Sequence, residues 1–111
     1  MKEENQLRKQ NGAAYTNVYH AARKKLKLTF VEYIVADIVS QLSHSTNKAG
    51  GWCYMSKDSM AELLDLSRMQ IHRIINTLLK QKLIERDPST TFLRSSPRWI
   101  AEVVETYHYN S

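Results

Sequence analysis

The 111-residue chain has little cysteine and glycine, and each shortage excludes a kind of protein. Its one cysteine, Cys53, cannot form an intramolecular disulfide, so we expect a reducing compartment and a cytoplasmic location. Three glycines supply no phosphate-cradling loop. Apolar runs are also short: the longest, 30–39, is interrupted by Glu32 and Asp37, and the first residues are polar. The sequence therefore predicts neither a membrane span nor a signal peptide.

Catalytic and metal-binding patterns are equally scarce. The four histidines are scattered, and none has a metal-ligand spacing with Cys53; they are His20, His44, His72 and His108. A cysteine within an apolar, strand-like run is more typical of a small core residue than of a nucleophile. We therefore predict that the chain is not an enzyme and binds no cofactor or metal.

Acidic residues are missing from one stretch in particular. None occurs among the 17 positions from Ser67 to Leu83, although the chain has 11 in all. The formal net charge is +5 and the sequence pI is about 9.4, which suits a polyanionic partner. Many small soluble proteins are basic, so the pattern within this stretch carries the argument rather than the total charge.

The stretch 67–80 predicts an amphipathic helix. Its apolar residues recur at i, i+3, i+4, i+7 and i+8, the spacing of one buried face: Ile71, Ile74, Ile75, Leu78 and Leu79. Ser67 is placed to cap the helix, and Gln70 to complete a capping box. The opposite face is basic or amide-bearing, and it consists of Met69, Arg73, Asn76 and Lys80, with Gln70 and His72 at its flanks.

The segments around this helix predict a second helix and a hairpin. Residues 56–64 begin with a capping serine and place three apolar residues on one face, so they predict a short helix. A tight link, 65–67, contains Leu66 to fill the angle between the two helices. Two β-prone runs, 82–86 and 91–94, follow the second helix and are separated by a proline-containing turn at 87–90. Residues 52–55 are expected to form a short strand that pairs with this hairpin.

Further helices are expected toward the N-terminus. Residues 1–12 predict a flexible tail, and a helix over about 13–27 follows from the spacing of Tyr15, Val18, Tyr19, Ala22 and Leu26. The basic run 23–27 at its end either complements the helix dipole or contacts phosphates. Thr29 and Glu32 form a second capping box, which begins a scaffold helix that extends to about Ser43. Residues 43–51 predict a loop.

The C-terminal segment predicts a helix, with a third pairing strand as the alternative. Ser96 is a good cap, and Pro97 suits the first helical position. An apolar stripe follows at helical spacing: Trp99, Ile100, Val103, Val104 and Tyr107. The scaffold helix also has more apolar residues than a three-helix domain needs, namely Phe30, Tyr33 and Val39. These surplus residues cover either the chain's own core or a partner's, so a homodimer through the N- and C-terminal helices is a second expectation.

Residues from about 29 to 95 resemble the winged helix-turn-helix domains of bacterial and phage regulators and of phage or plasmid replication proteins. The resemblance is carried by 52–56, 60–67 and 73–84. It implies a mainly α fold with a small β-hairpin wing, in which a three-helix core has flanking N- and C-terminal helices. The domain with its N-terminal helix would cover 13–95 and the C-terminal helix or tail 96–111. One departure concerns Lys82, because the family often has a glycine at Gln81 or Lys82 before the Leu-Ile pair.

The resemblance implies sequence-specific binding of double-stranded DNA, with the second helix in the major groove. Arg73 can reach guanine, Gln70 can bond adenine if its capping role allows, and Met69 can touch a thymine methyl. Arg68 and Lys80 lie near the helix ends, where phosphates run, and Arg86 and Arg94 flank the wing. The full set of predicted DNA-binding residues is Lys57, Arg68, Met69, Gln70, His72, Arg73, Asn76, Lys80, Arg86 and Arg94.

Two biological roles fit such a protein, a transcriptional regulator or an origin-binding replication protein. The alternative from another class is a protein–protein interaction module within a larger assembly. Such a module would tolerate acidic residues on the second helix and would expose more apolar ones there. The face opposite the apolar stripe has one large apolar residue, Met69, so the sequence favours DNA.

Overall fold

The computed structural model describes residues 16–44 and 51–108, and describes side-chain burial as far as residue 106. In these ranges the fold is mainly helical, with a small two-stranded antiparallel hairpin, as the sequence predicts. The elements in chain order are α2 (His20–Lys25), α3 (Phe30–His44), α4 (Lys57–Leu64), α5 (Arg68–Lys80), β1 (Ile84–Arg86), β2 (Leu93–Ser95), α6 (Pro97–Trp99) and the π-helix η1 (Ile100–His108). The predicted tail 1–12 and residues 45–50 of the predicted loop lie outside the described residues.

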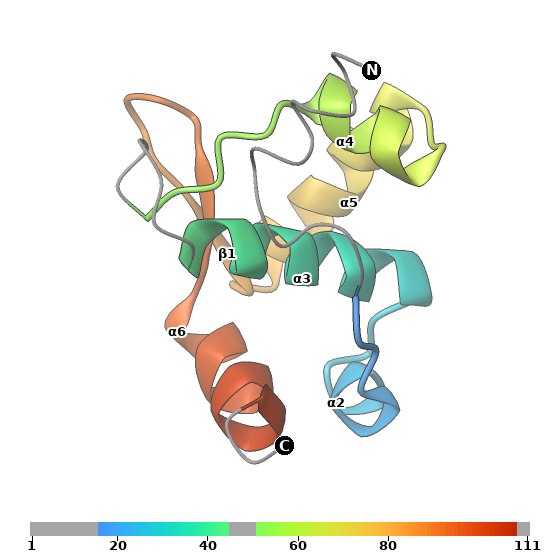
Figure 1. The fold of residues 1–111 in the computed structure, drawn as a ribbon, viewed down its shortest axis with the longest axis vertical. Helices are drawn as coiled ribbons and strands as arrows, with labels where there is room; N and C mark the ends of the chain where they lie inside the picture. The colour runs from blue at the N-terminus through green and yellow to red at the C-terminus, as the bar shows by residue number, and fades with distance from the viewer. Residues whose placement is uncertain (1–15, 45–50, 109–111) are drawn as a thin grey trace.

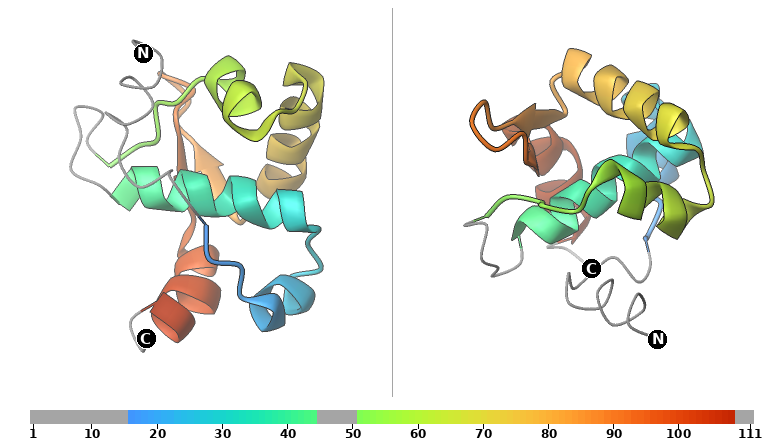
Figure 2. Two further views of the ribbon diagram at one scale, coloured as in Figure 1. Left: turned by 45° about the vertical axis from the view of Figure 1, so that its right-hand side comes forward. Right: turned by 90° about the horizontal axis from the view of Figure 1, so that it is seen from above.

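Helix α3 is the scaffold on which the other elements pack. Helices α4 and α5 lie on one side of it, while α2 and the C-terminal α6–η1 segment lie on the other (Figures 1 and 2). Its start is fixed by the predicted capping box: Thr29 Oγ1 accepts from the Glu32 backbone N–H at 3.2 Å, and Glu32 Oε1 accepts from the Thr29 N–H at 2.8 Å. The helix ends one residue beyond the predicted Ser43.

The two predicted caps that position α4 and α5 are both present. Ser56 Oγ accepts from the Ser59 backbone N–H at 3.0 Å at the start of α4. At the start of α5, Ser67 Oγ accepts from the Gln70 N–H at 3.1 Å, and Gln70 Oε1 accepts from the Ser67 N–H at 2.8 Å. Leu66, in the link between them, is partly buried against the core, as predicted. The start of α5 is therefore set by contacts within four residues of sequence.

Three helices end in the same way, with a residue of positive φ that is not glycine. Lys27 after α2, Asp65 after α4 and Lys82 after α5 have φ values of 58°, 56° and 60°. After α5, the Lys82 and Leu83 backbone N–H groups donate to the carbonyls of Leu79 and Leu78, both at 3.0 Å, which completes a Schellman motif. The left-handed conformation at Lys82 explains why glycine would suit this position. The chain keeps the turn although it has lysine there.

The hairpin forms with shorter strands than predicted. Lys82 and Thr91 both have positive φ, which removes the first residues of each predicted run from the ladder, so pairing is limited to Ile84–Arg86 and Leu93–Ser95. Asp87 closes the turn by accepting from the Ser89 N–H at 3.2 Å and the Thr90 hydroxyl at 2.7 Å, and these bonds lower the pKa of Asp87. The strand predicted at 52–55 is reduced to a single bridge between Cys53 and Leu93.

The prediction for the N-terminal helix was too long. Helix α2 begins at His20, and residues 16–19 are not helical. Val18 and Tyr19 are nevertheless packed against the core, so their apolar character reflects burial of an irregular segment rather than a helical face. Tyr15, which the prediction also used, lies outside the described residues.

The C-terminal segment is helical, and the strand alternative is wrong. Ser96 Oγ accepts from the Trp99 backbone N–H at 3.3 Å, with Pro97 at the first position, as predicted. Trp99 and Val103 are fully buried in the chain's own core. The Trp99 ring packs against Tyr33 with centroids 5.1 Å apart. Since Val39 is buried as well, much of the apolar surplus is used within the chain. The homodimer stays a prediction.

Candidate nucleic-acid interface

Helix α5 separates into two faces as its sequence predicts. Ile71, Ile75 and Leu78 are buried, and Ile74 and Leu79 are partly buried against the same core. The predicted reading residues are all exposed, and these are Arg68, Met69, Gln70, His72, Arg73, Asn76 and Lys80. The exposed face therefore contains cations, amides and an imidazole, but no acid.

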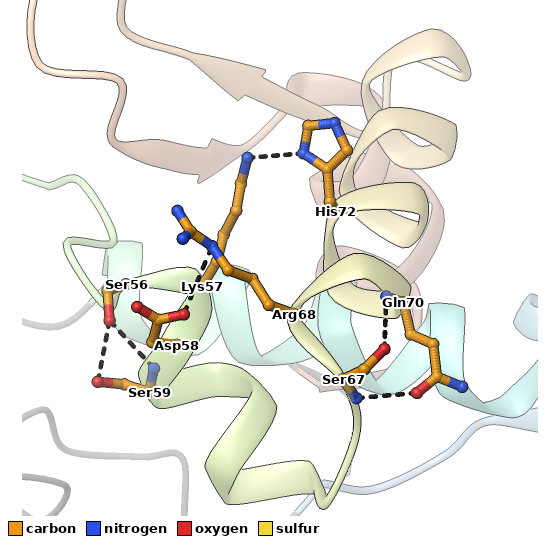
Figure 3. Close-up of polar contacts among 8 residues, drawn as sticks. All are labelled: Ser56, Lys57, Asp58, Ser59, Ser67, Arg68, Gln70 and His72. Carbon is orange, nitrogen blue, oxygen red and sulfur yellow. Dashed lines mark hydrogen bonds and ion pairs between the residues drawn. The ribbon is translucent and has the colours of Figure 1, made fainter.

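A hydrogen bond connects α4 to the exposed face of α5. Lys57, the first residue of α4, extends across to His72, and its Nζ lies 2.9 Å from the His72 Nδ1 (Figure 3). Because an ammonium can only donate, His72 accepts at Nδ1. The His72 Nε2 then carries the proton of the neutral ring, and it lies 3.1 Å from the Asn76 Nδ2 position, one turn further along α5. A hydrogen bond forms there with the Asn76 amide turned so that its oxygen accepts. The bond from Lys57 holds the imidazole on the exposed face.

Three cations gather where α4, α5 and the hairpin meet. Burial and the nearby guanidinium groups of Arg86 and Arg68 lower the pKa of Lys57. All three cations line a groove of about 410 Å³ between the hairpin and the N-terminal ends of α4 and α5. Asp58 is the acid in this lining, and its Oδ1 lies 3.4 Å from the Arg68 Nε (Figure 3). The cluster therefore has an excess of positive charge.

Two of the predicted reading residues have other contacts on α5. The Gln70 side-chain oxygen is used in the capping box, so a two-point contact with adenine requires the box to open. Arg73 lies one turn after Met69, with an Nη2 to Sδ distance of 3.6 Å. A thioether is a weak acceptor, so this contact leaves the guanidinium available to a stronger one.

The structure does not bring Arg94 together with the other predicted residues. Arg94 pairs with Glu85 at 2.9 Å, and its guanidinium lies 4.3 Å from the centroid of the Trp52 ring. It lines a separate depression with His44 and Pro97, whereas Arg86 lines the groove beside α5. Glu85 is the register partner of Arg94, and successive strand residues face opposite sides of a sheet, so Arg86 and Arg94 face opposite ways.

The basic run 23–27, in and just after the last turn of α2, forms a separate surface. Lys25 pairs with Glu102 at 2.8 Å, and Arg23 lies over the Phe30 ring at 4.3 Å and donates to the Leu28 carbonyl at 3.1 Å. Helix α2 lies across α3 from α4 and α5 (Figure 2). Its cations therefore stabilise the end of their own helix and do not extend the exposed face of α5.

Sequence reasoning missed an aromatic pair in the groove. Tyr54 and Phe92 line it beside the cations, with ring centroids 6.3 Å apart. Both residues are remote from α5 in sequence, so no helical pattern includes them. A signal did exist, because Cys53 is buried and alternation along a strand would then point Tyr54 outward.

Within the described ranges there is no group of three or more histidine, cysteine or acidic side chains able to hold a metal ion. Nor is any described helix both long and apolar enough to cross a membrane. Comparison of the chain with protein-family models, curated proteins and solved structures gave no significant match.

Proposed function

We propose that the chain is a winged helix-turn-helix protein that binds double-stranded DNA, with α5 in the major groove and the β1–β2 hairpin as the wing. The observation that carries the proposal is the continuity of the acid-free face of α5 with the cation cluster Lys57, Arg68 and Arg86. One face thus offers hydrogen-bonding groups for base edges, and its border offers charges for phosphates.

The electrostatics of the cluster favour an anion. Burial is the largest cause of the lowered pKa of Lys57, and repulsion by Arg86 and Arg68 lowers this pKa further. A phosphate between these side chains would remove that repulsion, and the DNA would release condensed counterions at the same time. Asp58, the acid in the groove lining, is held by Arg68 at a distance longer than a strong ion pair, so DNA can displace it at little cost.

The dimensions of α5 suit the major groove. Its 13 residues extend over about 20 Å, and a helix with its side chains is about as wide as that groove. Arg73 and Asn76 lie one turn apart along the exposed face, with His72 held beside Asn76. These are the groups that we assign to base contacts, while Arg68 and Lys80 at the two ends contact phosphates.

The alternative, a protein-docking module, has one observation in its favour. Met69 is 64% exposed on the same face of α5. An interface core is depleted in charge and rich in aromatic residues, whereas Met69 is surrounded by cations and amides. DNA is therefore the better-supported partner. A transcriptional regulator and an origin-binding replication protein would both use this surface.

Base reading by Arg73 can be tested directly. A preferred site is first selected from a random duplex pool with the full chain. We expect Arg73→Ala to weaken binding to that site by about 1–3 kcal/mol and to relax the base preference at one position. Replacing the guanine there by 7-deazaguanine, which lacks the major-groove N7, should weaken the wild-type protein but not Arg73→Ala. The measurement is fluorescence anisotropy.

Lys24→Ala is the matched control, since it removes a cation from the separate surface at the last turn of α2. It should bind the selected site as the wild type does and should respond normally to 7-deazaguanine. If Arg73→Ala binds as tightly as the wild type and 7-deazaguanine has no effect at any position, then Arg73 does not read a guanine in the major groove.

A further inference from the structure

The groove beside α5 has a wall that duplex binding does not explain. Tyr54 follows the bridge residue Cys53 and is 40% exposed, and Phe92 directly precedes β2. Their rings are tilted by 54° with centroids 6.3 Å apart. Both line the same groove of about 410 Å³ as the three cations of the cluster. The same groove is thus lined by aromatic rings and by positive charges.

We propose that this groove binds an unpaired nucleotide of DNA, with the base against Tyr54 and Phe92 and its phosphate between Lys57, Arg68 and Arg86. The proposal rests on the proposed function, because the nucleotide would belong to DNA that α5 already holds. Lys57 connects the two regions: its Nζ contacts His72 on the exposed face of α5, and the same side chain lines the groove.

The groove matches a nucleotide in volume, in charge and in its aromatic rings. Its volume lies within the usual range for a small-ligand site. Its charged lining has three cations against Asp58, which suits a monoanionic phosphate. Aromatic rings beside cations are what proteins use to hold single strands, because every base has a stacking face.

A paired base cannot use this wall, since both its faces are covered by neighbouring pairs. An unpaired base can turn out of the helix and stack on Tyr54. The groove therefore favours DNA that is opened next to the site held by α5, over a continuous duplex of the same sequence.

The test compares a fully paired duplex with duplexes of the same sequence that contain a three-nucleotide unpaired loop, placed at successive positions in different probes. A 2-aminopurine in the loop reports stacking through quenching of its fluorescence. For the best-placed loop, we expect the wild-type full chain to bind about five- to a hundredfold more tightly than the paired duplex and to quench the 2-aminopurine.

Tyr54→Ala should bring the ratio of the two affinities close to one and abolish the quenching, and Tyr54→Phe should restore both. Phe30→Ala removes an aromatic ring that is 54% exposed but lies outside the groove lining, so it should keep the wild-type ratio. Equal affinity for paired and looped duplexes would overturn this proposal and leave the proposed function standing. So would an affinity ratio that survives in Tyr54→Ala. Failure to bind either duplex would overturn both.

Discussion

Trp99→Ala is expected to lower the free energy of unfolding by about 3–5 kcal/mol. Trp99 is fully buried, packs against Tyr33, and ends α6, where its backbone N–H donates to the Ser96 Oγ. Removing the indole leaves a cavity between α3 and the C-terminal segment. A domain of this size is stable by roughly 5–15 kcal/mol, so the loss is a large part of the total. Urea unfolding followed by far-ultraviolet circular dichroism measures it.

Trp99→Phe is the control for this prediction. It keeps a large ring against Tyr33 and removes the indole N–H, a buried donor for which the described part of the chain provides no acceptor. We therefore expect a clearly smaller loss than for alanine. If Trp99→Ala lowers the free energy of unfolding by less than about 1 kcal/mol, this would contradict the packing of Trp99 in the core. A loss that depends on protein concentration would place Trp99 in a dimer interface instead.

The double variant Lys57→Ala/Arg86→Ala should weaken duplex binding roughly ten- to a hundredfold at moderate salt, because each side chain neutralises a phosphate. The slope of log K against log salt should also become shallower by about two, at 0.9 per phosphate lost. Arg86 is exposed and Lys57 is half-buried, and neither belongs to the buried core, so the fold should persist. Anisotropy titrations at several salt concentrations give the affinity and the slope together.

Lys24→Ala/Lys27→Ala is the matched control, because it removes the same number of charges from the far side of α3. It should change the affinity by less than about twofold. Equal effects of the two double variants would mean that total charge, and not the cluster, drives binding. A larger effect of the α2 variant would move the phosphate-contacting surface to the basic run 23–27.

The elements that could be predicted from the sequence are those fixed by local chemistry. Two reciprocal capping boxes, Thr29 with Glu32 and Ser67 with Gln70, set the starts of α3 and α5 through contacts three residues apart. The apolar stripe of α5 follows from the 3.6-residue period. These features need no knowledge of the rest of the chain, and for that reason the exposed face of α5 was identified correctly.

The features that could not be predicted depend on contacts remote in sequence. Arg94 faces away from α5 because the strand register places it opposite Glu85, and sequence alone does not give that register. Tyr54 and Phe92 meet only because the segment before α4 bridges to β2. The start of α2 at His20 also depends on distant contacts. Val18 and Tyr19 pack against the core from an irregular segment, and their spacing in the sequence is the same as in a helix.

The central claim is that the cation cluster and the exposed face of α5 together bind duplex DNA. The most direct measurement is an anisotropy titration of the wild-type full chain into a random-sequence duplex over a range of salt concentrations. The account predicts binding at low salt that weakens linearly on a log–log plot, with a slope of about −3 or steeper for the three cations of the cluster. Absence of binding at the lowest salt, or binding indifferent to salt, would contradict it.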